Sequence, residues 1–312
     1  TVATLVADEL FDVYVLDGKL DKANELISQV LKNNIEFYAN DSYLANRKIN
    51  RLIKAGMPEH ASEILRELLN RTTKDDVIED FKYKLANTYM LMYDKTNYYL
   101  EKAKELYKDI ISDYSQGIHT KNSKMYIDEI LMRQGFLNPS VVAAKYQDVE
   151  AMQQKALLQE LINDRNDKKY ELIMKSEKVY KKVSNEIVNR FGYENMDEIF
   201  DEVNIELIKD YLAQGKCSEI SDALKTARSK TLEKLIEDES VKYNFFECLV
   251  ESPYERAYLQ IKDTFNKTRD ANIYLYLERM AFSLDLMEEA LDFSSKVEMV
   301  NDDKILAKEF IY

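Results

Sequence analysis

The sequence predicts an all-α fold built from antiparallel helix hairpins, and three observations lead to it. The 312 residues include only 6 Gly and 3 Pro, far fewer than the turns of a sheet-rich protein of this length require. Charged residues make up 32% and hydrophobic residues 46% of the chain, and the apolar positions recur at i, i+3, i+4 and i+7. Helix–turn–helix units follow one another at intervals of 33 to 38 residues, which is typical of a solenoid.

The first hairpin, at about residues 3–33, defines the unit that the rest of the chain repeats. Its first helix ends at Gly18, and its second begins near Asp21 after a tight turn. Ala23 is informative because a small side chain lets two helix backbones approach closely. We expect the two helices to press together through six side chains: Leu10, Tyr14, Leu20, Ala23, Ile27 and Val30.

Three more hairpins follow the first. The second occupies about residues 42–70, and the third runs from Glu79 to the polar break at 115–117, with a longer turn between its helices. A fourth ends its first helix near Gly135 and continues through Pro139. The residues that define the repeat in the second and third hairpins are Gly56, Ala61, Tyr89 and Ala103.

The middle of the chain departs from this rhythm. Residues 140–191 contain no Gly or Pro, and the polar stretch 163–167 is the one signal for a break. The pattern predicts a long helical pair, inserted between two sets of hairpins. We expect this pair to protrude from the array or to cap it.

Short hairpins return after the helical pair. Their repeat-defining residues are Gly215 in a turn and Ala257 and Ala290 in second helices. The predicted organisation is therefore N-terminal hairpins, a long helical pair and C-terminal hairpins, at residues 1–139, 140–192 and 193–312. An apolar stripe predicts that the last hairpins continue beyond a truncated end: Ile305, Leu306, Phe310 and Ile311.

The repeat-defining residues resemble those of the tetratricopeptide (TPR) family, whose unit of about 34 residues has a small residue in its second helix. The best match combines Leu10, Tyr14, Gly18 and Ala23, and the resemblance covers two-thirds of the chain, with 140–191 outside it. The resemblance implies a TPR-like α-solenoid whose concave groove holds a peptide or another protein. The composition and degenerate repeats also look like bacterial envelope scaffolds, including the paralysed-flagella type of periplasmic flagellar-motor scaffold.

Composition and motifs argue against several other functions. A net charge of −13 disfavours nucleic-acid binding. The sequence contains no run of 18 apolar residues, so we expect no direct membrane insertion. The chain contains no nucleotide-binding, zinc-protease, nucleophile-elbow or calcium-loop motif, so we expect no catalysis, no cofactor and no small-molecule substrate. His60 and His119 fall in different hairpins. Cys217 and Cys248 fit helix contacts, although a disulfide between adjacent repeats is an open alternative.

Three pairs of residues are candidates for protein binding. Asp8 and Asp12 are expected to face the groove, where they would repel a carboxylate and favour a basic or neutral partner. Tyr98 and Tyr99 lie in the longer turn of the third hairpin, where they either anchor an interface or pack the turn. In the locally basic stretch 165–182, Lys175 and Lys178 either form a solvated face or dock an acidic partner.

The sequence therefore predicts a non-catalytic scaffold for protein–protein interaction, which binds other proteins in a large assembly. Its resemblance to envelope and flagellar-motor scaffolds favours the periplasm. The alternative is a TPR-type peptide sensor or adaptor that switches another domain. An enzyme with a helical-repeat shell is disfavoured by the missing motifs and the scattered histidines.

Overall fold

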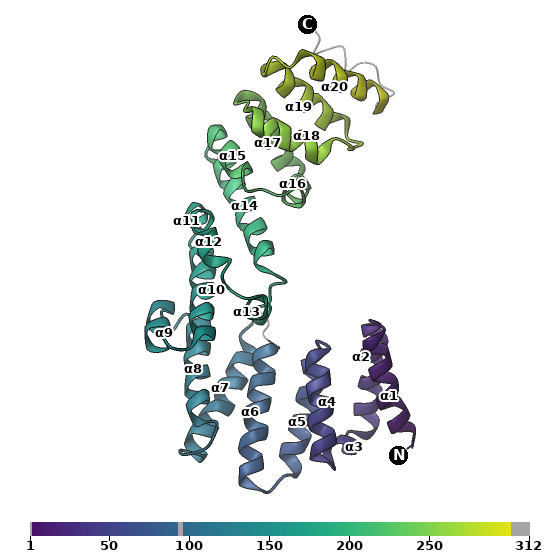
Figure 1. Ribbon diagram of the computed structural model, residues 1–312, viewed down its shortest axis with the longest axis vertical. Coiled ribbons are helices and arrows are strands. Elements are labelled where there is room, and N and C mark those ends of the chain that lie inside the picture. Colours follow the sequence, from purple (N-terminus) through teal and green to yellow (C-terminus); the bar gives the residue numbers. More distant parts are fainter. Residues whose placement is uncertain (1, 93–95, 301–312) are drawn as a thin grey trace. The chain divides into compact units, whose positions relative to one another are not determined.

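The structure, a computed structural model, describes residues 2–92 and 96–300, which form twenty α-helices and no strand (Figure 1). The predicted all-α fold class is confirmed. The chain divides into two compact units, and within each unit helices pack mainly on their neighbours in sequence, as in a solenoid. Unit 1 comprises Thr1–Glu160 and Val183–Glu194, and unit 2 comprises Leu161–Lys182 and Asn195–Tyr312.

Unit 1 is built from successive hairpins, in which α1 packs on α2, α4 on α5, and α6 on both α5 and α7. It also contains most of α10 (Glu150–Asn166), whose last residues belong to unit 2. Its other helices are α1 (Val2–Leu16), α2 (Leu20–Asn34), α3 (Glu36–Ala39), α4 (Ser42–Lys54), α5 (Pro58–Arg71), α6 (Asp75–Leu91), α7 (Tyr98–Asp113), α8 (Thr120–Arg133), α9 (Pro139–Lys145) and α13 (Asn185–Arg190).

Unit 2 repeats the same construction. Helix α14 packs on α11, α15, α16 and α17, and the last hairpin pairs α19 with α20. Its helices are α11 (Tyr170–Lys175), α12 (Glu177–Tyr180), α14 (Met196–Ala213), α15 (Cys217–Leu224), α16 (Ser229–Leu235), α17 (Glu239–Glu251), α18 (Glu255–Phe265), α19 (Ala271–Ser283) and α20 (Met287–Val300). None of the described helices is long and apolar enough to cross a membrane.

Four of the described hairpin turns share one backbone motif. After α1, the Gly18 N–H donates to the Val15 carbonyl (3.1 Å), and the Lys19 N–H donates to the Tyr14 carbonyl (2.8 Å). This pair of bonds is the Schellman motif, which needs a left-handed residue at the turn. The same pair recurs after α4, α14 and α19, where the left-handed residues are Gly56, Gly215 and Asp285.

The predicted small residues lie where two helices meet. Each is buried near the start of a second helix, at 7% exposure or less. Their short side chains allow close approach, and the surrounding aliphatic residues fill the space between hairpins. They are Ala23, Ala61, Ala103, Ala257 and Ala290.

The buried face of α1 differs from the prediction. Leu10 is exposed, as is Leu20 at the start of α2, and Phe11 is buried in the place expected for Leu10. The reason is that α1 is apolar on several faces, so the apolar period does not select one of them. The burial of Asp8, which bonds to later helices, sets the rotation of α1 instead.

The predicted long helical pair is also corrected. Helix α10 is long, but residues 170–190 form three short helices, and the predicted segment 140–192 is shared between both units. Hydrogen bonds that sequence periodicity does not reveal lie at two of the breaks. The Gln153 side chain donates to the Ala143 and Tyr146 carbonyls at the end of α9, and extended Ser184 donates its N–H to Gln154. The C-terminal stripe containing Ile305, Leu306, Phe310 and Ile311 lies outside the described residues.

The shared turn motif predicts opposite effects for two substitutions in unit 2. Gly215→Ala should lower the free energy of unfolding by about 1 kcal/mol, because an added Cβ meets no neighbour but disfavours the left-handed backbone. Asp285→Gly should raise it by up to about 1 kcal/mol, because glycine relieves the same constraint. Urea unfolding of both variants tests this pair. Loss of stability in Asp285→Gly, or none in Gly215→Ala, would contradict it.

Candidate functional site

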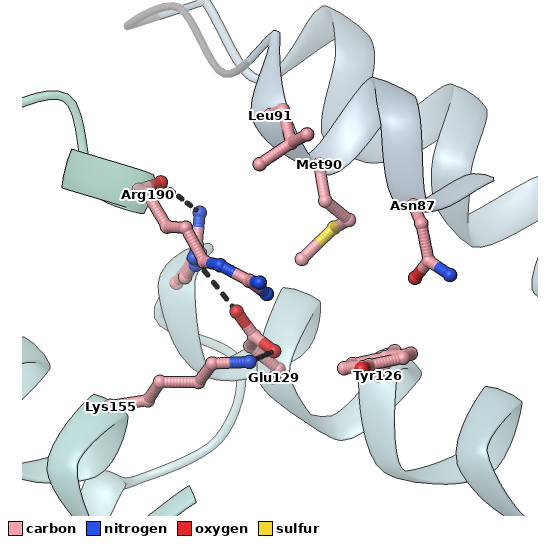
Figure 2. A pocket seen from close by; sticks show the side chains of 8 residues that line it. Asn87, Met90, Leu91, Tyr126, Glu129, Lys155 and Arg190 are labelled. Atoms are coloured by element: carbon pink, nitrogen blue, oxygen red, sulfur yellow. Dashed lines mark hydrogen bonds and ion pairs between the residues drawn. The ribbon is translucent and has the colours of Figure 1, made fainter. Parts of the chain in front are cut away.

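Unit 1 contains a pocket of about 200 Å³, partly open to solvent, that is lined by charged side chains and that we call the inner cavity (Figure 2). One wall is formed by α6, and the others by α8, α10 and the end of α13. Its charged lining consists of the carboxylate of Glu129 and three cations. Among the described residues, the lining is Asn87, Met90, Leu91, Tyr126, Glu129, Arg133, Lys155 and Arg190.

The local sequence positions each charged group. Glu129 and Arg133 are four residues apart on α8, so both lie on the same face of that helix. Burial of Ile130 and Met132 fixes the rotation of α8, and Lys155 reaches the cavity from α10. Arg190 is the last residue of α13.

A single carboxylate joins these elements. Glu129 Oε1 accepts a hydrogen bond from Arg133 Nη2 (2.8 Å), and Glu129 Oε2 accepts one from Lys155 Nζ (2.5 Å). Arg133 Nη1 donates to the backbone carbonyl of Arg190 (3.1 Å), which ties α13 to α8. Figure 2 shows Lys155 and Arg190 approaching Glu129 from different helices. The side chains of Glu129, Arg133 and Lys155 are each at most 4% exposed.

Aromatic rings cover two of the cations. The Arg133 guanidinium lies 3.8 Å from the ring centroid of Phe191, and Lys155 Nζ lies 5.1 Å from that of Tyr126. The negative faces of the rings offset part of the desolvation of these cations. They add no ionic charge, so the described lining still has three cations and one carboxylate.

Burial and charge together change the acidities at this site. Burial alone raises the pKa of Glu129, but Arg133 and Lys155 outweigh it and hold that pKa below its usual range. Burial lowers the pKa of Lys155, and the attraction of Glu129 opposes this only in part. Burial also raises the pKa of Tyr126 to about 12.

A second, larger cavity of about 430 Å³ adjoins the first and shares Tyr126, Lys155 and Arg190 with it. Two acidic residues, Glu150 and Glu186, belong to the lining of this outer cavity. Glu186 accepts a hydrogen bond from Arg190 Nη2 (2.8 Å) and is itself largely exposed. Positive charge is thus concentrated inside, and negative charge lies on the outer side.

The side chains that line the inner cavity determine which groups it can contact. Its described lining supplies charge, amide and hydroxyl groups, but no histidine, serine or cysteine that could act as a nucleophile–base pair. Within residues 2–92 and 96–300, no group of three or more His, Cys, Asp and Glu side chains could hold a metal ion. The arrangement can hold an anionic group by charge-assisted hydrogen bonds.

The two predicted tyrosines lie at the start of α7 and line another pocket of unit 1, of about 180 Å³. Tyr98 is 55% exposed, and its ring packs edge-on against Tyr99 with centroids 5.1 Å apart. Tyr99 in turn lies 5.9 Å from the ring of buried Tyr89. We call this pocket the tyrosine groove; its lining is Glu59, Ser62, Glu63, Arg66, Tyr89, Met92, Tyr98, Tyr99 and Lys102.

The two predicted aspartates face cations. Asp8 is buried, lies 2.6 Å from Lys48 Nζ, and accepts a hydrogen bond from the Tyr38 hydroxyl (2.7 Å). Asp12, at the edge, pairs with Arg51. A binding partner would therefore contact Asp12 and Arg51 together. The Asp8 carboxylate is buried and stabilises the packing of α1 against α4.

The predicted lysines and histidines lie elsewhere. Lys175 is exposed on α11 and pairs with Glu171 (3.2 Å), and Lys178 is exposed on α12. His60 lies between Glu63 and the side chains of α2, where it links two hairpins. His119 stacks on the ring of Tyr83, with centroids 4.0 Å apart.

The two cysteines form a disulfide. Cys217 begins α15 and Cys248 lies in α17, and their Cα atoms are 4.9 Å apart. The bond joins consecutive hairpins of unit 2. Of the two alternatives that the sequence left open, the structure shows the disulfide.

The charged cavity is the feature that the sequence prediction missed. Its one local signal is the Glu129–Arg133 pair, which sits beside Ile130 in an apolar stripe of α8. Charges placed on the buried face of a helix need partners from other elements. Those partners, Lys155 and Arg190, are distant in sequence, so periodicity could not identify them.

Comparison with known proteins leaves the family open. No family model matches the chain, and no curated protein matches it either.

Glu129→Gln should lower the free energy of unfolding at pH 7 by about 3–5 kcal/mol, because buried cations would lose their compensating charge. Since the folded pKa of Glu129 is depressed, its stabilisation is present above the unfolded pKa of about 4.3 and is lost as pH falls through the folded value. The difference from the wild type should therefore shrink in acid. Urea titrations from pH 7 to pH 3 measure it.

The matched control for that substitution is Glu186→Gln, which removes an exposed carboxylate from the same region. It should change stability by less than about 1 kcal/mol at every pH. A Glu129→Gln effect that equals this control, or that does not vary with pH, would show that Glu129 is not a buried ionised partner.

Proposed function

We propose that this protein is a non-catalytic scaffold for protein–protein interaction, with TPR-like hairpins and other proteins as its partners. The observation that carries the proposal is the tyrosine groove. Large aromatic side chains with a polar tip are typical anchors of protein interfaces, and such anchors act best in a pocket that excludes water. Tyr98 is the exposed member of this set. Its ring packs against Tyr99, which in turn packs against buried Tyr89.

The groove favours a particular partner chemistry. Its charges are balanced between Glu59 and Glu63 on one side and Arg66 and Lys102 on the other. Lys102 Nζ lies 5.0 Å from the ring centroid of Tyr98, so the ring already has a cation beside it. A segment with an apolar or aromatic side chain, flanked by small polar groups, suits this surface better than a strongly charged one.

The disulfide supports an assembly outside the cytosol. Structural disulfides form and persist in oxidising compartments, and the bacterial periplasm is one of them. The Cys217–Cys248 bond therefore agrees with the resemblance to envelope scaffolds. We propose that the protein is a component of a bacterial envelope assembly, of which a flagellar motor is one example.

A peptide-binding sensor is the second candidate. The small size of the tyrosine groove, about 180 Å³, favours it, since such a pocket could hold one side chain of a short peptide. The two candidates differ in what is bound. A scaffold keeps a folded neighbour at this groove in the intact assembly, whereas a sensor exchanges a free peptide.

Photo-crosslinking in the cells that make the protein tests the scaffold. p-Benzoyl-phenylalanine at position 98 should give one defined adduct with an envelope protein, because the side chain at this position contacts the partner. The same group at position 43 is the control, since Tyr43 is also exposed but lies on α4, away from the groove. Equal adducts from both positions would contradict the proposal, and a short peptide adduct would favour the sensor.

Thiol trapping tests the compartment. Cells quenched in acid and treated with a maleimide reagent should show no labelling of Cys217 or Cys248 until the protein is reduced. With 31 residues separating the two cysteines, reduction should lower the stability of unit 2 by about 2–4 kcal/mol. Quantitative labelling of both cysteines in unreduced cells would contradict an oxidising compartment.

A further inference from the structure

The inner cavity of unit 1 has more cations than carboxylates among its described lining residues. Among residues 2–92 and 96–300, its charged lining is Arg133, Lys155 and Arg190 together with one carboxylate, that of Glu129. Desolvating like charges together is unfavourable unless an opposite charge joins them. Lys155 is buried, whereas the Arg190 side chain is 36% exposed and pairs on its outer side with Glu186, which is 75% exposed.

Unused hydrogen-bond donors point into the same region. The Nε of Arg190 is buried and has no hydrogen-bond partner among the described residues. The Lys155 ammonium carries three N–H donors, and the Glu129 carboxylate is the one described acceptor that bonds to it. Buried donors in folded proteins are nearly always satisfied, so a missing acceptor is informative.

The size of the inner cavity and the charges around it limit the kind of ligand that it can bind. A cavity of about 200 Å³ has room for several waters, each of which occupies roughly 30 Å³ in the liquid, or for one small anion. Glu150 and Glu186 line the outer cavity, and their charge opposes the approach of a large polyanionic surface. The site therefore suits a small molecule and not a nucleic acid or an acidic protein face.

We propose that this cavity binds one small oxyanion, a phosphate or a small dicarboxylate, between Lys155 and Arg190. The anion supplies the missing acceptor to the Arg190 guanidinium and to the Lys155 ammonium, and it balances the positive charge around Glu129. Since Arg190 closes the cavity from α13, a bound anion also fastens residues 183–194 to the rest of unit 1. This binding goes beyond scaffolding and does not depend on it.

Calorimetric titration of the full chain tests the proposal, with sodium phosphate and sodium succinate each compared with sodium chloride at equal ionic strength. We expect saturable binding of one anion per chain and a higher melting temperature by circular dichroism. Binding of either anion supports the site, and the anion that binds identifies the source of the oxyanion. No saturable binding beyond chloride would overturn the proposal.

Three variants make the test specific. Arg190→Gln should weaken binding by about tenfold or more, because it removes a charge-assisted contact. The matched control is Arg165→Gln, which removes a partly exposed arginine paired with Glu202 in unit 2 and should leave affinity unchanged. Lys155→Met, with a similar side-chain length, replaces Arg190→Gln if that variant does not fold and should also weaken binding about tenfold.

Glu129→Gln separates anion binding from a merely structural role. The substitution removes the negative charge of Glu129, so the variant should bind the anion severalfold more tightly than the wild type does. The anion should also raise the melting temperature of the variant by more than it raises that of the wild type. Equal weakening in Arg165→Gln and Arg190→Gln, or weaker binding in a folded Glu129→Gln variant, would overturn the proposal.

Discussion

The structure of unit 1 depends on one buried carboxylate. Glu129 binds cations from α8 and α10, and through Arg133 it also fixes the end of α13. Without a negative charge here, burial of these cations would be strongly unfavourable. The carboxylate therefore explains how residues 183–194 belong to unit 1 although residues 161–182 belong to unit 2. Asp8 plays a similar part among α1, α3 and α4, where it bonds to Lys48 and Tyr38.

Local chemistry predicts much of this fold, and long-range contacts account for the rest. The turn at Gly18 and the buried small residues such as Ala23 could be predicted, because a left-handed turn and a close helix contact each demand a particular residue type. The short helices of 170–190 could not, since the apolar period continues across their breaks and the bond from Ser184 to Gln154 joins residues distant in sequence. Of the candidate sites, Tyr98 and Tyr99 lie at a pocket, whereas the charged cavity depends on pairings that one sequence does not reveal.

The two units contribute different features to the proposed scaffold. Unit 1 holds both the tyrosine groove and the charged cavity, and α6 contributes residues to each of them. Unit 2 carries the disulfide, which joins consecutive hairpins and fits an oxidising compartment. Repeated hairpins supply rigid surfaces of this kind, because each unit is stabilised mainly by its neighbours. Function then resides in the few side chains that depart from the repeat.

The central claim is that the cavity of unit 1 is charged, buried and more positive than Glu129 alone can balance. Nuclear magnetic resonance of lysine side-chain nitrogens measures this directly at Lys155. The account predicts that its pKa lies below 10.5, because burial outweighs the attraction of Glu129. In the same spectra Lys169 should titrate above 10.5, because Asp167 and Asp164 hold its charged form at the surface. A Lys155 pKa at or above that of Lys169 would contradict the account.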